Sequence, residues 1–259
     1  MNHFPATYFS FPPLAVWFFL IVHLAALVSL VGALRRWSLE GSLQPRLGNV
    51  VEFSWTDALA IGVLLLGGVF SAGGFFLALA PIPLILVLVR FRGLPIRSYL
   101  GLDRYRWIHI FGLGLWICLA AYLPLQALAA GCSALAQALG LPVEPQPAVV
   151  WFLKARGTPG FWFLLVAVLG IAPFGEELLF RGFLYPLLKR RFSYPQAVVW
   201  SAAVFALFHA HWLTFLPLFG LGIVLALAYE FSGALLLSIA IHFWFNGLTT
   251  GLLLLAPPL

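Results

Sequence analysis

PFGEELLFRG, residues 173–182, places two glutamates and an arginine inside a long apolar run that extends from about residue 159 to residue 188. About 20 apolar residues are enough for a helix to cross a bilayer, so we expect this run to be a transmembrane helix. A proline inside a helix removes a hydrogen bond and clashes with the preceding turn, which predicts a kink or break at Pro173. Ionised groups at membrane depth are costly and mark candidate functional sites.

The whole chain is similarly apolar. Of its 259 residues 63% are hydrophobic and 8% are charged, whereas a soluble domain is nearer about 25% charged. We therefore predict an all-α, polytopic integral membrane protein. The two cysteines, Cys118 and Cys132, lie in an apolar segment and indicate neither a disulfide framework nor a metal site. The formal net charge of the chain is +6, and most basic residues lie in short loops between apolar runs. This distribution favours contact with acidic lipid head groups and argues against nucleic acid as a partner.

The apolar runs predict eight membrane spans. Their approximate ranges are 14–34, two short helices within 58–90 that separate at 71–74, 107–139 with a bend at Pro124, 159–188, 194–209, 213–229 and 233–255. The proline-rich stretch 141–150 is predicted to be an exposed linker. We divide the chain into 1–157 and 158–259, each with about four spans, packed as one membrane domain.

Loop charges test this count. The loops 35–57, 90–106 and 189–193 carry three, five and three basic residues. With eight spans and the N-terminus outside, all three face the cytoplasm, as the preference of lysine and arginine for that side requires. The loop 140–158, on the opposite side, has only Lys154 and Arg156.

Polar groups from separate helices reach a similar depth in this arrangement. At a rise of 1.5 Å per residue, Glu176 lies roughly 20 Å, His209 roughly 22 Å and His242 roughly 14 Å from the ends of their helices. The sequence therefore predicts that one carboxylate and two imidazoles meet within the membrane.

Helical spacing separates the roles of the two glutamates. Glu177 and Arg181 are at i and i+4, share a helix face and are predicted to form a structural ion pair. Glu176 is rotated by about 100° and is free to point at another helix. His242 and Asn246 are also at i and i+4, so Asn246 can orient a histidine or stabilise an oxyanion.

These residue types suit hydrolysis. A desolvated Glu176 can act as a general base on water, with His209 sharing the proton. Alternatively, Glu176, His209 and His242 form a possible zinc ligand set, so the cofactor is either none or zinc. The chain has no HExxH motif, and no serine or cysteine lies beside a suitable base. We interpret His211 as interfacial and Glu230 as a solvated residue at a helix end.

Three motifs in this order, EELLFRGFLY, FALFH and HFWFN, resemble the CPBP family of intramembrane endopeptidases. That family includes CAAX prenyl proteases and bacteriocin-processing or immunity proteins. Its pattern is EExxxR, then FxxxH, then HxxxN or HxxxD. The resemblance covers roughly residues 160–250.

The resemblance implies about eight transmembrane helices, a cavity open to the cytoplasm and peptide-bond hydrolysis. It implies Glu176 as the base, His209 as its partner, and His242 with Asn246 as oxyanion support. Glu177, Arg181 and Phe205 would then be structural neighbours of the catalytic groups. The implied substrate is a peptide or membrane protein, including lipidated ones, and the expected location is a bacterial cytoplasmic membrane.

Two other functions remain open on the sequence. A non-catalytic immunity or scaffold protein could use the same helices to bind a peptide or partner. A proton-coupled transporter could use Glu176 and the histidines as a relay, but the chain shows no internal repeat of the transporter kind.

Overall fold

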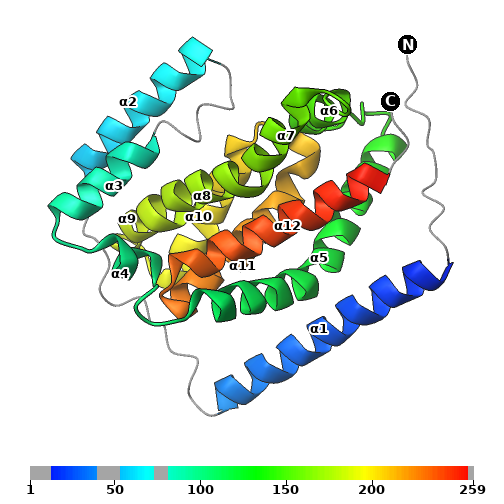
Figure 1. The fold of residues 1–259 in the computed structure, drawn as a ribbon, viewed down its shortest axis with the longest axis horizontal. Coiled ribbons are helices and arrows are strands. Elements are labelled where there is room, and N and C mark those ends of the chain that lie inside the picture. The colour runs from blue at the N-terminus through cyan, green and yellow to red at the C-terminus, as the bar shows by residue number, and fades with distance from the viewer. Residues whose placement is uncertain (1–12, 40–52, 73–80, 256–259) are drawn as a thin grey trace.

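The computed structural model describes residues 13–39, 53–72 and 81–255, and these residues form helices and connecting loops without a strand. The elements, labelled in Figure 1 where there is room, are α1 (Pro13–Leu39), α2 (Trp55–Ala72), α3 (Pro81–Phe91), α4 (Ile96–Leu100), α5 (Trp107–Ala138), α6 (Pro147–Lys154), α7 (Pro159–Val166), η1 (Ala167–Ile171), α8 (Ala172–Glu177), η2 (Leu178–Leu184), α9 (Tyr185–Lys189), α10 (Tyr194–Phe208), η3 (Trp212–Thr214), α11 (Phe215–Ser232) and α12 (Leu235–Leu255).

Four helical runs in the described part of the chain are long and apolar enough to cross a membrane. They are Trp107–Ala138, Pro159–Lys189, Trp212–Ser232 and Leu235–Leu255. Three shorter apolar helices accompany them, at Trp17–Ala33, Ile82–Phe91 and Tyr194–Phe208. The prediction of an all-α polytopic membrane protein is confirmed, and the count of eight spans stays a prediction.

The helix α12 lies inside the bundle, where it packs against α5, α11 and α8 (Figure 1). The helices α10 and α11 pack closely at Gly222. A Cβ atom at this position would lie only 2.9 Å from the Cα of Ala202. The helix α1 lies against α5, and α2 and α3 form a pair at the other side of the bundle (Figure 1). This packing brings α8, α10 and α12, which carry the three motifs, into one core.

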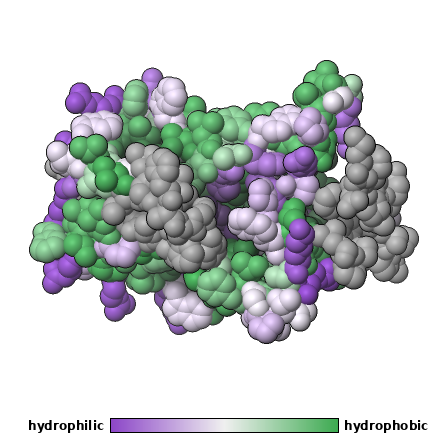
Figure 2. All heavy atoms as spheres, turned by 90° about the horizontal axis from the view of Figure 1, so that it is seen from above, coloured by the Kyte–Doolittle hydropathy of each residue, from purple (hydrophilic) through white to green (hydrophobic). Residues whose placement is uncertain are grey.

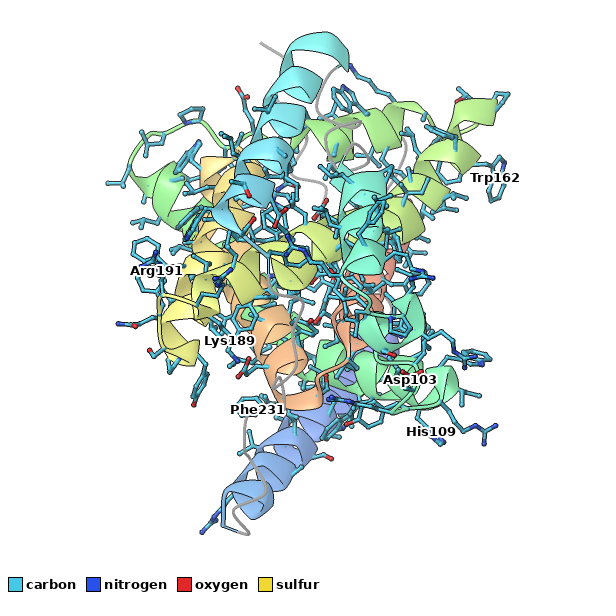
Figure 3. All side chains as sticks on the ribbon, turned by 90° about the vertical axis from the view of Figure 1, so that its left-hand side faces the viewer. Asp103, His109, Trp162, Lys189, Arg191 and Phe231 are labelled. Atoms are coloured by element: carbon cyan, nitrogen blue, oxygen red, sulfur yellow. The ribbon has the colours of Figure 1, made fainter. Side chains whose placement is uncertain are left out.

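Parts of the three basic loops meet at one end of the bundle. The Arg190 guanidinium donates to the carbonyl oxygen of Phe53. Gly101 packs so tightly on the turn before α12 that a Cβ there would lie 2.5 Å from the Cα of Ala234. Figure 3 shows Asp103, His109, Lys189 and Phe231 in the lower half of the view and Trp162 near its top. This arrangement agrees with the loop assignment made from charge.

The helix that carries the acidic motif does not break at Pro173, and the alternative of a kink there stays a prediction. The chain is helical from Pro159 to Lys189, and Pro173 is buried near the start of α8. The π-helical segment η1 directly precedes α8, and a second π segment, η2, follows it. Wider π turns let a helix continue past a residue that cannot donate a backbone hydrogen bond.

Other boundaries also differ from expectation. The stretch 141–150 is not entirely a linker, because α6 begins at Pro147. The short helix α4 lies within the basic loop 90–106, where no helix was expected. Pro124 lies inside α5, and Figure 1 shows that α5 bends along its length. The predicted separation at 71–74 begins at the end of α2, and residues 73–80 lie outside the described part of the chain.

The outer surface suits a bilayer. Large apolar side chains are exposed along α1, including Trp17, Phe18, Ile21, Leu24 and Val28. In the view of Figure 2, hydrophobic residues cover much of the face, while hydrophilic ones gather at one end and in a group near the centre. Exposed apolar area of this extent fits contact with lipid.

Candidate active site

Glu177 is fully buried and has two partners on different helices. Its Oε1 accepts hydrogen bonds from Nη1 of Arg181 at 3.0 Å and from Nδ1 of His242 at 2.9 Å. Arg181, also fully buried, donates through Nη2 to the carbonyl oxygen of Gly222 at 3.0 Å. The predicted i,i+4 ion pair is therefore confirmed, and it belongs to a network that joins the α8–η2 region, α11 and α12.

Glu176 points toward two histidines from other helices. Its Oε2 lies 3.7 Å from Nε2 of His209 and 3.9 Å from Nε2 of His242. Both separations exceed a direct hydrogen bond. Oε2 is buried and makes no hydrogen bond to any group in the described residues. The structure thus brings together the carboxylate and the two imidazoles, on α8, at the end of α10 and on α12.

The hydrogen bonds of the two histidines determine which nitrogen carries the proton. Nδ1 of His209 lies 2.8 Å from the carbonyl oxygen of Phe205, which can only accept. Nδ1 of His242 faces Oε1 of Glu177, which also accepts the hydrogen bond from Arg181 and so acts as an acceptor here. Each Nδ1 is therefore the donor. In the neutral imidazoles, both Nε2 atoms are then acceptors that face Glu176.

The Phe205 ring packs among the charged and aromatic groups of the site. Its centroid lies 4.8 Å from that of His209 and 5.8 Å from that of His242, both edge to face. The guanidinium carbon of Arg181 lies 4.4 Å from the same centroid. Phe205 is itself fully buried, so one side chain supports both imidazoles and the cation.

Asn246 lies one helical turn from His242 on α12, but its amide nitrogen donates to the carbonyl oxygen of Val168 at 2.9 Å. Val168 belongs to the π segment η1, where carbonyl groups lack regular α-helical partners. The contact ties α12 to the helix that carries Glu176. Asn246 is only half-buried, and one of its amide hydrogens remains for another acceptor.

Glu230 is not solvated, contrary to the interpretation from sequence. It is fully buried, and Lys189 donates to its two carboxylate oxygens at 2.7 and 2.9 Å. The Tyr185 hydroxyl donates to the same carboxylate at 2.7 Å. These contacts fasten the end of α11 to α9. The burial arises because residues more than 40 positions away in sequence cover the carboxylate.

His211 is half-buried and is more than an interfacial residue. Its ring nitrogens lie 3.0 Å from Oγ1 of Thr214 and 3.1 Å from the carbonyl oxygen of Glu144. Neither residue belongs to the group around Glu176, and the hydrogen bonds of His211 do not reach that carboxylate.

The zinc alternative can be tested on the same atoms. The part of the chain described by the structure holds no group of three or more His, Cys, Asp or Glu residues arranged to hold a metal ion. Tetrahedral zinc ligands with bond lengths of roughly 2.0–2.1 Å lie roughly 3.3 Å apart. The carboxylate-to-imidazole separations at Glu176 are wider, so His209 and His242 would have to move inward to bind zinc.

Sequence reasoning missed one contact of this site. It paired Glu177 with Arg181 alone, because spacing along one helix reveals only local neighbours. The hydrogen bond from His242 depends on how α12 packs against α8, and no spacing within either motif encodes it. The π segments on either side of α8 were also not predicted.

Fold and site together define a class of protein: an all-α integral membrane protein with a buried group of one carboxylate and two imidazoles. Residues 158–248 match the family model described as Rce1-like, type II CAAX prenyl endopeptidase Rce1-like. This segment, about a third of the chain, is similar to the CAAX prenyl endopeptidases and contains the three motifs that carry the resemblance. No curated protein and no solved structure matches the chain.

Proposed function

We propose that this protein is an intramembrane endopeptidase in which Glu176 activates a water molecule to hydrolyse a peptide bond. The observation that carries the proposal is the position of its Oε2, which faces Nε2 of both His209 and His242 at 3.7 and 3.9 Å. The family match at residues 158–248 supports peptidase chemistry independently of this geometry.

The separations suit a water molecule held between acceptors. Polar groups more than about 3.5 Å apart are often bridged by water. Glu176 and His209 both present acceptors, so one water can donate a hydrogen to each. Such a water is oriented and polarised for attack, and the buried carboxylate can take its proton.

The reaction then balances as follows. The water oxygen bonds to the carbonyl carbon of the substrate, and its proton passes to Glu176. The resulting tetrahedral oxyanion collapses, the C–N bond breaks, and the proton is delivered to the leaving nitrogen. The products are a carboxylic acid and an amine, and transfer of the remaining water proton between them gives carboxylate and ammonium. His209 stabilises the transferred proton by accepting a hydrogen bond at Nε2.

His242 has a different task in this proposal. In its neutral form Nε2 carries no proton and cannot stabilise an oxyanion, because its Nδ1 proton is committed to Glu177. Protonated at both nitrogens, the ring would donate through Nε2 instead. The remaining amide hydrogen of Asn246 is a second candidate donor. Glu177 thus acts through His242, whose ring it orients, and Arg181 holds the Glu177 carboxylate in place.

A zinc-dependent variant of the same hydrolysis uses Glu176, His209 and His242 as ligands, with zinc supplying a bound water of lowered pKa. We favour the metal-free form because both carboxylate-to-imidazole separations, 3.7 and 3.9 Å, are wider than zinc requires. Metal analysis of the purified active protein discriminates the two. Stoichiometric zinc, with loss of activity on its removal and recovery on its return, would establish the metal-dependent form.

The proposed substrate is a peptide or membrane protein in the lipid bilayer, with no role for nucleic acid. Lipidated substrates deserve the first assays because the family description refers to prenyl endopeptidases. We propose that the basic end of the bundle faces the cytoplasm of a bacterial cell, with residues 1–157 and 158–259 packed as one domain.

The test compares protein N-termini in membranes that contain either the wild-type chain or Glu176→Gln. We expect a set of new N-termini with the wild type that is absent with the variant at equal expression. Identical sets would argue for a non-catalytic scaffold or immunity protein.

A further inference from the structure

The connection that follows His209 is strained and tightly bound. His209 is the C-cap residue directly after α10, and Ala210 follows it in the left-handed region with φ 49°. Within the described residues, Ala210 is the only non-glycine with a positive φ. This conformation is disfavoured by the Cβ atom, and helices usually place glycine at such a position. The surroundings must therefore hold Ala210 in place.

Two hydrogen bonds of the His211 ring fix the segment that contains Ala210. Its Nε2 faces the carbonyl oxygen of Glu144 at 3.1 Å, and its Nδ1 faces Oγ1 of Thr214 at 3.0 Å. Glu144 lies in the segment before α6, whereas Thr214 ends η3. One imidazole thus joins the α10–α11 connection to the α5–α6 linker.

Hydrogen-bond directions make this contact specific. A carbonyl oxygen only accepts, so Nε2 of His211 carries the proton and Nδ1 of the neutral ring accepts from the Thr214 hydroxyl. The Thr214 oxygen in turn accepts from Nε2 of Gln146 at 2.7 Å. The Thr214 hydroxyl also reaches the carbonyl oxygen of His211, at 3.3 Å, so it has two acceptors on the same residue. The resulting chain runs from Gln146 through Thr214 and His211 to Glu144.

The end of α10 depends on this arrangement. The backbone N–H groups of His209 and Ala210 donate to Ala206 and Leu207, three residues earlier, so the last turn is tighter than the rest of the helix. If Ala210 relaxed toward an ordinary conformation, the turn would shift and carry His209 with it. Nε2 of His209 would then leave its position 3.7 Å from Glu176.

We propose that His211 is a positioning residue, which holds Ala210 in its left-handed conformation and so aims His209 at Glu176. The effect of His211 on catalysis rests on the proposed function, whereas its effect on the position of His209 does not. It predicts that the need for His211 disappears when the residue at position 210 adopts the left-handed conformation without strain. Glycine is that residue.

The first experiment measures kcat and KM on a cleaved peptide substrate. His211→Ala is expected to lower kcat roughly ten- to a hundredfold with little change in KM, the size typical of a slightly misplaced catalytic group. His211→Gln, whose amide can still donate to Glu144, should recover part of the loss. Adding Ala210→Gly to His211→Ala should restore kcat. His109→Ala, at an exposed histidine on α5, is the matched control and should leave kcat unchanged.

The second experiment does not need activity. With histidine labelled at Cε1, the His209 signal is assigned by its loss in His209→Ala. We expect the signal to shift in His211→Ala and to return in the double variant with Ala210→Gly. Failure of either change overturns the inference, as does a His211→Ala protein with wild-type kcat. If the signals behave as expected while no peptide is cleaved, the proposed function fails and the positioning role of His211 stands.

Discussion

Nδ1 of His242 lies 2.9 Å from Oε1 of Glu177, the same oxygen that accepts a hydrogen bond from Arg181. One buried carboxylate therefore accepts hydrogen bonds from a guanidinium and from an imidazole at the same time. The arrangement leaves Glu176, the adjacent residue, as the acidic group of the pair that can face a reacting water.

Replacing Glu177 separates its two effects. Glu177→Gln leaves Arg181 buried without a counter-ion, and breaking such a pair typically costs about 3–5 kcal/mol of stability. It also removes the carboxylate that accepts from Nδ1 of His242 and orients the ring, so kcat should fall. Thermal unfolding in detergent and peptide cleavage measure the two losses.

A double variant is the control for this prediction. Glu177→Gln with Arg181→Met removes both charges and should recover most of the stability, because no uncompensated ion remains. It should not recover kcat. Full activity in the stable double variant would show that Glu177 has no role beyond pairing with Arg181.

Gly182 allows α4 to approach the helix that carries the acidic motif. A Cβ at this position would overlap the Tyr99 hydroxyl and lie 3.0 Å from its Cζ and 3.2 Å from Cδ2 of Leu235. Gly182→Ala should therefore destabilise the protein by about 1–3 kcal/mol through overpacking. The thermal midpoint of the purified variant gives the measurement.

Tyr99→Phe tests the cause of that loss. The Tyr99 hydroxyl is buried and has no hydrogen-bond partner among the described residues, so its removal should be neutral or slightly stabilising. Combined with Gly182→Ala it should recover at least about 0.5 kcal/mol beyond additivity. Strict additivity of the two substitutions would refute the proposed overlap.

Asp57 links stability to acid pH. Burial alone would raise the pKa of its carboxyl, but hydrogen bonds from Ser54 and the pairing with Arg92 outweigh burial and lower the pKa below the ordinary 3.8. A carboxyl with a lower pKa in the folded state stabilises the fold above its unfolded pKa, and this contribution is lost as pH falls through the folded value. The loss should occur between about pH 4 and pH 2.

The matching variant is Asp57→Asn. Its thermal midpoint should decline less on the acid side than that of the wild type. The corresponding difference in the free energy of unfolding should stay below about 1 kcal/mol, because the pair is partly exposed to solvent. Parallel acid-side curves for the two proteins would contradict the assignment.

Local and periodic features of this protein could be predicted from its sequence. Spacing alone indicated the Glu177–Arg181 ion pair, and helix lengths indicated that Glu176, His209 and His242 reach a common depth. Both rest on the fixed rise and rotation of an α-helix. The apolar runs likewise indicated an all-α membrane fold before any contact was known.

Features that depend on packing could not be predicted. Glu230, close to Ser232 and a glycine, resembles a solvated helix end, yet Lys189 and Tyr185 from α9 bury it. Pro173 indicated a break, but the π segment η1 lets the helix continue. In each case the deciding partner is either distant in sequence or a departure from α-helical geometry.

The central claim is that the Glu176 carboxylate activates the water that cleaves a peptide bond. The most direct measurement is single-turnover cleavage of a peptide substrate by purified Glu176→Gln and by the wild type. The thermal midpoint and helical content of the variant must equal those of the wild type, which shows that it is folded. Glutamine keeps the size of the side chain but cannot take up a proton, so we predict no cleavage above the uncatalysed background. Wild-type turnover by the folded variant would contradict this account.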